Sequence, residues 1–361
     1  MAAMLALAPA AAHGEPSLTA AAAEFRQACH AADWMVPRVA LGRALWQRID
    51  ETLATAASDA DFSILARRLE TEAAAQGGDC RIAPDTVDRF GRVSVFFGRT
   101  GPYVEVRTTL GLVCGNAIAT ALYHRTPNGW RRFWRDMGDG TPSALLALRV
   151  VEDGDRNLVL VAERGQWCDT VWQPLRLRLW RAGPGMPPAL LWERREYAHW
   201  GTGDDRFALA FDGHRLRVEF DVASIDASRG QRHVIRHFSV EGDTVRRRDP
   251  VAAGPAEFVE EWLSQPWQAA ADWTEPSARD GTGRMHALLR GRGGAPSLSG
   301  IFAGAAERCR HDSSLWQVRM DFADLSPERR SVTFLIRAGQ GGLLRMTAVR
   351  HAPWPDCTIL R

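Results

Sequence analysis

The stretch "RLWRAGPGMPPALLWERRE", residues 178–196, decides how the chain is divided. Apolar strand-like residues come first, a turn rich in glycine and proline follows, and a second apolar segment ends in charged residues. Two such segments on either side of a turn predict a β-hairpin. Because two similar hairpins lie elsewhere in the chain, the stretch predicts a repeated unit and not an isolated hairpin.

The three hairpins share an aromatic residue near the end of the first strand, at Tyr123, Trp180 and Phe238, which are 57 and 58 residues apart. Each second strand ends in arginines and an acidic residue. Each hairpin also follows another pair of predicted strands, in residues 92–110, 144–162 and 207–222. The sequence therefore predicts three consecutive units of about four antiparallel strands, and a late hairpin in residues 331–349 is a candidate for a fourth.

Units of four antiparallel strands in series resemble the blades of a β-propeller. That resemblance implies a propeller-like arrangement, and a β-sandwich or curved sheet made of consecutive hairpins is an equal alternative. The N-terminal region differs, because Leu41, Leu45 and Ile49 form an apolar stripe at helical spacing. We therefore expect a mainly β fold with an N-terminal helical segment.

The expected domains follow from these periodicities. Residues 278–297 have the most loop-like composition and mark a boundary. We predict a signal peptide at 1–12, a helical cap at 13–90, three blade-like β units at 91–250, a helical connector at 251–278 and a C-terminal β region at 279–361.

The basic residues are unusual, because all 45 of the lysine and arginine positions are arginine. Without lysine the chain cannot form a Schiff base, complete a P-loop or act as a protein kinase. The net charge of +2 indicates no nucleic-acid partner. No apolar stretch approaches the length of about 20 residues that a membrane span needs, so we expect none.

Two features predict export to the periplasm or the medium. The apolar residues 2–12 end in small residues, and Ala10 and Ala12 fit a signal-peptidase site. The number of cysteines is even and none forms a C-x-x-C pair, which favours disulfides over zinc ribbons. Sequential pairing is our prediction among the fifteen possible patterns, and six free thiols in a cytosolic protein are the alternative. The pairs would be Cys29–Cys80, Cys114–Cys168 and Cys309–Cys357.

Catalytic motifs are few. The best candidate is the Gly-rich loop 199–205, in which His199, Asp204 and Asp205 could act as acid and base, although such loops are usually plain connectors. His233 and His237 alternate with apolar residues and therefore predict a strand, which separates them by about 13 Å. One metal ion cannot bridge that distance, so we expect no metal and no cofactor.

Two residue types suggest ligand binding. Arginines occur at alternate positions in 176–178 and 215–217 and as a run in 246–248, a pattern typical of a solvated strand face or of a surface for acidic ligands. We name Arg246 and Arg247 as candidates. Most of the fourteen tryptophans should pack in the core, and the four near predicted turns should be exposed: Trp130, Trp167, Trp172 and Trp200.

These observations favour an exported, non-catalytic binding or scaffold protein whose ligand the sequence does not identify. An envelope protein or a glycan is the expected partner. The first alternative is a hydrolase of extracellular polymers with its site in the loops between units. The second is an inhibitor of one specific partner.

Overall fold

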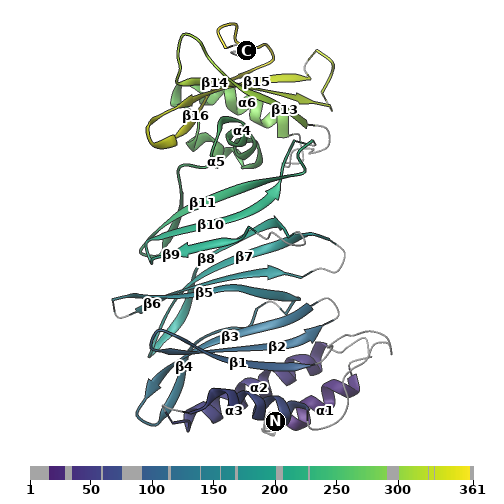
Figure 1. Ribbon diagram of the computed structural model, residues 1–361, viewed down its shortest axis with the longest axis vertical. Coiled ribbons are helices and arrows are strands. Elements are labelled where there is room, and N and C mark those ends of the chain that lie inside the picture. Colours follow the sequence, from purple (N-terminus) through teal and green to yellow (C-terminus); the bar gives the residue numbers. More distant parts are fainter. Residues whose placement is uncertain are drawn as a thin grey trace, which may run out of the picture. The chain divides into compact units, whose positions relative to one another are not determined.

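The structure is a computed structural model (Figure 1). It describes residues 16–28, 35–57, 60–74, 92–112, 115–138, 140–154, 156–166, 170–200, 206–226, 228–290, 301–323, 325–328 and 330–357. The chain forms two compact units. Unit 1 is Met1–Asp169 with Arg176–Leu190, and unit 2 is Thr170–Leu175 with Leu191–Arg361.

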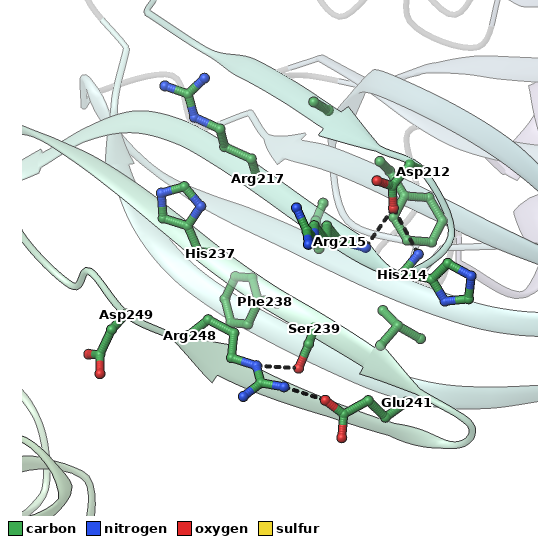
Figure 2. A pocket seen from close by; sticks show the side chains of 14 residues that line it. Asp212, His214, Arg215, Arg217, His237, Phe238, Ser239, Glu241, Arg248 and Asp249 are labelled. Carbon is green, nitrogen blue, oxygen red and sulfur yellow. Dashed lines mark hydrogen bonds and ion pairs between the residues drawn. The ribbon is translucent and has the colours of Figure 1, made fainter. Parts of the chain in front are cut away.

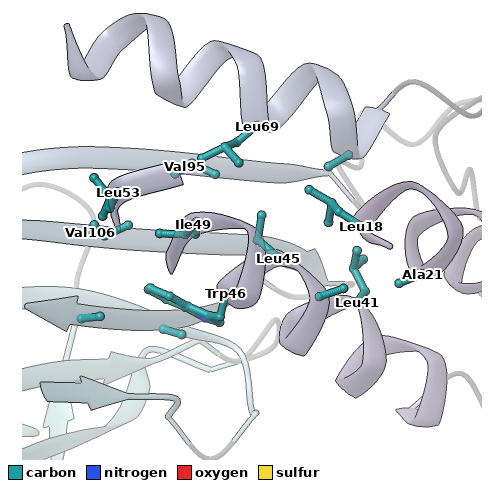
Figure 3. Packing of buried hydrophobic residues seen from close by; sticks show 14 of the residues in the cluster. Leu18, Ala21, Leu41, Leu45, Trp46, Ile49, Leu53, Leu69, Val95 and Val106 are labelled. Carbon is teal, nitrogen blue, oxygen red and sulfur yellow. The ribbon is translucent and has the colours of Figure 1, made fainter. Parts of the chain in front are cut away.

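Three helices form the N-terminal part of unit 1: α1 (Leu18–Ala28), α2 (Met35–Ala54) and α3 (Phe62–Ala74). The apolar stripe of α2 packs on the first strands, and Trp46, Ile49 and Val106 are almost fully buried in one cluster (Figure 3). Asp50 lies on the same face of α2, and its carboxylate accepts hydrogen bonds from Tyr123 at 2.7 Å and from Arg132 at 2.6 Å.

The strands that follow form an eight-stranded sheet in the order β1-β2-β3-β5-β6-β7-β8, and β4 pairs with β3. The first two predicted units are joined in this sheet by one residue pair, Asn116 with Ser143, so they are not separate blades. The strands are β1 (Val93–Thr100), β2 (Tyr103–Leu112), β3 (Gly115–Thr126), β4 (Gly129–Asp136), β5 (Ser143–Asp153), β6 (Arg156–Gly165), β7 (Trp172–Gly183) and β8 (Met186–His199).

In unit 2, the third predicted unit is a four-stranded antiparallel sheet of its own, in the order β12-β11-β10-β9. Its strands are β9 (Ala208–Phe211), β10 (Arg215–Ala223), β11 (Gln231–Glu241) and β12 (Thr244–Arg248).

Helices and a second four-stranded sheet complete unit 2. Phe258 and Trp262 of α4 pack against Val318, Phe334 and Met346 of the sheet, and all five are almost fully buried. The elements are α4 (Pro255–Ser264), α5 (Trp267–Asp272), α6 (Arg279–Arg290), β13 (Ile301–Arg308), β14 (Leu315–Phe322), β15 (Ser331–Ala338), β16 (Leu344–Arg350) and the short 3-10 helices Pro276–Ala278 and Gln340–Gly342.

The predicted fold class is confirmed: the chain is mainly β, with N-terminal helices and antiparallel sheets. The described residues form no closed propeller. The loop-like interpretation of 278–297 is wrong for its first part, because α6 occupies Arg279–Arg290. Thr282, His286 and Leu289 lie on one side of this helix and are buried, so tertiary packing overrides its two glycines.

None of the helices in the described part of the chain is both long enough and apolar enough to cross a bilayer. The disulfide Cys309–Cys357 is confirmed and packs beside the half-covered Trp354 and the buried Leu335. The predicted signal peptide and the other four cysteines lie outside the described residues, namely residues 1–12 and Cys29, Cys80, Cys114 and Cys168.

Replacing Cys309 and Cys357 together by serine should destabilise unit 2 by about 2–4 kcal/mol, because the bridge closes a loop with a sequence separation of 48. Denaturant unfolding followed by tryptophan fluorescence measures the change. As a control, the wild type and the double variant are compared under reducing conditions, where the difference in their stability should disappear. A wild-type protein that unfolds identically with and without reductant would contradict the expectation.

Candidate functional site

The outward face of the β9–β12 sheet is the candidate site. In β10 and β11, buried side chains alternate with more exposed ones, as a sheet with one covered face requires. Leu216, Val218 and Phe220 lie on the covered face, so Arg215 and Arg217 lie on the outward one. Residues paired across antiparallel strands share a face, so the register determines which side chains of β11 and β12 join them.

Two neighbouring rows of this face are rich in cations. Arg215 pairs with Ser239, which pairs with Arg246, and in the next row Arg217 pairs with His237, which pairs with Arg248. Neighbouring strands lie about 4.8 Å apart, and successive rows along a strand about 7 Å apart. We call these residues the cationic face: Arg215, Arg217, His237, Ser239, Arg246 and Arg248.

A pocket of about 820 Å³ opens on most of this face (Figure 2). Arg215, Arg217, His237 and Arg248 line it. Acidic residues lie at its margin, and Asp212 accepts hydrogen bonds from the backbone N–H groups of the β9–β10 turn.

The arginines of the cationic face differ in how they are neutralised. Arg217 forms an ion pair with Glu219 at 2.8 Å, and Arg248 pairs with Glu241. Among the described residues, Arg215, Arg246 and His237 make no side-chain hydrogen bond and no ion pair. Two guanidinium groups and one imidazole are therefore available to a ligand.

The surroundings of His237 affect its protonation state. Burial lowers the pKa of His237 below its ordinary value of 6.5, and the positive charge of Arg217 lowers it further; Glu219 opposes this shift, and Arg247 adds a smaller lowering effect. The free protein therefore holds a largely neutral imidazole between two arginines at neutral pH.

The next two rows of the face have a different character. His233 contacts Asp221 through Nδ1 at 2.8 Å and Glu219 through Nε2 at 3.3 Å. The expected strand is confirmed for His233 and His237, and among the described residues no cluster of metal-ligating side chains occurs. The acidic rows confine the cationic region to the end of the sheet that holds Arg215 and Arg246.

A buried ion cluster lies beneath this face. Glu261 of α4 contacts Arg232 at 2.7 Å, Arg247 at 2.9 Å and also Arg236. Glu260 contacts Arg232 at 3.1 Å and accepts a hydrogen bond from the Ile225 N–H. Several guanidinium nitrogens of the cluster and one carboxylate oxygen, Oε1 of Glu260, have no hydrogen-bond partner among the described residues.

Two arginine predictions need correction. Arg247, a candidate for ligand binding, points into the buried cluster and also lies 4.8 Å from the ring of Trp273; burial lowers its pKa to about 10. Arg178 was expected on a strand face, and in unit 1 it is buried between Asp136 and Glu163. In both cases facing carboxylates satisfy the buried charge.

The expected exposure of the tryptophans is wrong for two of the four candidates. Trp130 is only 5% exposed, because it packs against Phe62 and lies beneath the guanidinium groups of Arg99 and Arg125. Trp200 is 7% exposed and contacts Phe207.

The remaining candidates are only partly described. Trp172 is partly exposed and lies edge-on against His199, with ring centroids 4.8 Å apart. The structure does not describe Trp167, Asp204 or Asp205. The predicted acid–base loop is therefore described only at His199.

No protein-family model matches the chain, and no curated protein is similar to it in sequence. A solved structure of a BT0996 complex with RGII is 10% identical with a TM-score of 0.25, over 71% of the present protein and 72% of that one. Another, of a glycoside hydrolase, is 9% identical with a TM-score of 0.23, over 74% of the present protein and 89% of that one. Similarity at these TM-scores supports no argument about function.

Replacing Glu261 by glutamine should destabilise unit 2 by about 3–5 kcal/mol, because it leaves three buried arginines with too little negative charge. Although burial raises the pKa of the Glu261 carboxyl, the charges of the three arginines lower it well below 4.5. The contribution of Glu261 is therefore present above pH 4.5 and decreases as the pH falls below that value.

Denaturant unfolding at pH 7 and at lower pH values measures this effect. Glu257→Gln is the matched control, since the Glu257 side chain is 36% exposed and its ion pair with Arg229 spans 3.7 Å; that change should cost less than about 1 kcal/mol. Equal destabilisation by the two substitutions would show that the buried cluster is not the cause.

Proposed function

We propose that the protein is an exported, non-catalytic binding protein and that its cationic face binds an anionic polymer, in particular an acidic polysaccharide. The observation that supports this proposal best is the pairing of Arg215 and Arg246 across Ser239, with both guanidinium groups free of internal partners among the described residues. Guanidinium groups bind carboxylates through two parallel hydrogen bonds.

The geometry of the face favours a polymer over a single small anion. Arginines repeat in two rows about 7 Å apart, and Arg215 from one row and Arg217 and Arg248 from the other line one pocket, so successive acidic groups of one polymer could bind successive rows. Ser239, beside Arg246 in the sheet, accepts a hydrogen bond from Nε of Arg248 at 2.8 Å, and its O–H can donate to a sugar hydroxyl.

Contacts on the covered side of the same sheet hold the binding surface in place. The buried cluster fixes β11 and β12 to α4 through Glu261, so the backbone that presents the arginines has little freedom. A rigid platform reduces the entropy that binding must overcome.

The double substitution Arg215→Ala and Arg246→Ala should weaken the binding of polygalacturonate by about 100-fold or more, since each arginine supplies charge-assisted hydrogen bonds worth about 1.5–3 kcal/mol. Titration calorimetry at several salt concentrations measures the affinity and should show a weaker salt dependence in the variant. Neutral galactan should not bind, and inorganic polyphosphate tests whether the face distinguishes phosphate from carboxylate.

The matched control is Arg279→Ala with Arg284→Ala, which removes the same charge from exposed positions of α6. This control should leave the affinity within about twofold of the wild type. If both double variants weaken binding equally, the effect is one of net charge and the proposed face is wrong.

The affinity for polygalacturonate should rise as the pH falls from 7.5 towards 5.5. A bound carboxylate favours the charged form of His237, whose pKa is lowered in the free protein, so binding takes up a proton. His237→Gln should flatten this pH dependence while retaining binding at pH 7.5. Calorimetry in buffers of different ionisation enthalpy measures the proton uptake, and an identical pH profile in wild type and variant would contradict this role.

A further inference from the structure

β12 pairs with only part of β11. β10 pairs with β11 from Gln231 to Ser239, whereas β12 pairs with β11 only from His237 to Glu241. Pro250 follows two residues after the end of β12 and cannot donate a ladder hydrogen bond. The first half of β11 therefore has a strand neighbour on one side only.

The hydrogen-bond pattern shows which backbone groups face the open side. Val240 N–H donates to His214 at 2.8 Å and Ser224 N–H donates to Gly230 at 3.2 Å, so the even-numbered residues of β11 bond to β10. The odd-numbered residues point away from β10, because successive residues of a strand face opposite neighbours.

Three odd-numbered residues of β11 lie beyond the end of β12, namely Gln231, His233 and Ile235, and the Gln231 N–H donates to the Arg229 carbonyl at 2.7 Å. Among the described residues, the backbone N–H and C=O groups of His233 and Ile235 have no hydrogen-bond partner. We call Gln231–Arg236 the open edge of β11. An exposed edge of this kind pairs readily with another extended segment.

A groove of about 430 Å³ runs beside the open edge. Its apolar lining comes from the edge itself and from the residues after β12, namely Val234, Ile235, Pro250, Val251, Ala252 and Ala253. Arg229 and Glu257 also line it and form an ion pair at 3.7 Å. Arg232 and His233 line it too, and they pair with Glu261 and Asp221 respectively.

We propose that the open edge of β11 binds an extended peptide segment of a partner protein, which adds a strand antiparallel to β11 and in line with β12. The two donors and two acceptors of His233 and Ile235 match the main-chain groups of a strand, a mode of recognition in which backbone hydrogen bonds give affinity and pockets select side chains. This site uses the edge of the sheet and not its cationic face.

The groove determines which peptide fits. Residues of the added strand alternate between the outward face and the groove. Those that point into the groove meet proline, valine and alanine, where an unpaired charge would be costly to bury. The partner segment therefore has small, uncharged residues at alternate positions and spans about five residues.

Hydrogen exchange of the free protein gives the first test. The amides of His233 and Ile235 should exchange at close to the rate of an unstructured peptide, and those of Val234 and Arg236, which bond to β10, should be protected. Protection of His233 and Ile235 that rises with protein concentration would assign the edge to a second copy of this protein and overturn the proposal. Protection at every concentration would overturn it too.

The second test uses a blocked heptapeptide of alternating threonine and valine as the probe, titrated into the full-length protein and followed by NMR. Binding should slow exchange at His233 and Ile235 at least tenfold. Ile235→Pro should abolish that binding, because it removes a backbone N–H that points to the open edge and leaves the hydrogen bonds between β11 and β10 intact. Ala253→Arg, at an exposed position of the groove, should weaken binding without disturbing the fold.

The Arg215→Ala and Arg246→Ala variant is the matched control and should bind the heptapeptide as the wild type does, although it loses polygalacturonate. This separates failure of the edge site from failure of the anionic-polymer site. Absence of saturable binding to the wild type, or equal binding to the Ile235→Pro variant, would overturn the proposal.

Discussion

The contact between Glu261 and the arginines of β11 and β12 is the constraint on which unit 2 depends. Burying a carboxylate and three guanidinium groups is costly unless they face one another, so α4 and the sheet must meet in one register. That register fixes which side of β11 is covered. The outward side, with Arg215, His237 and Arg246, is therefore a consequence of a contact made on the opposite side of the sheet.

Arginine has two roles in one sheet because the protein contains no lysine. On the covered side, Arg232 and Arg236 meet the carboxylate of Glu261. On the outward side, Arg215 and Arg246 meet no internal partner among the described residues. The strand period of two assigns each residue to one side. A shift of one residue would bury the unpaired arginines and expose the paired ones, so the charge pattern itself opposes such a slip.

Periodicity and turns predicted the mainly β fold, the N-terminal helices and the arginine pattern of 215–217 and 246–248. They could not predict which arginines are buried, because Arg178 and Arg217 both alternate with apolar residues and differ only in what packs on them. Trp130 was misjudged for a similar reason: its turn is local, but the helix that covers it is distant in sequence. The helical spacing of Thr282, His286 and Leu289 was present in the sequence and was outweighed by the surrounding glycines.

The two proposed sites on β11 follow from one property of the strand, since β12 covers only part of its length. Where β12 is present, side chains of three strands line up and place arginines on both sides of His237. Where β12 is absent, the main-chain groups of His233 and Ile235 are left open. A longer β12 would pair with the open edge of β11 and would add rows to the cationic face. Pro250, which ends this pairing, therefore determines how much of β11 supports the cationic face and how much stays available to an extended peptide.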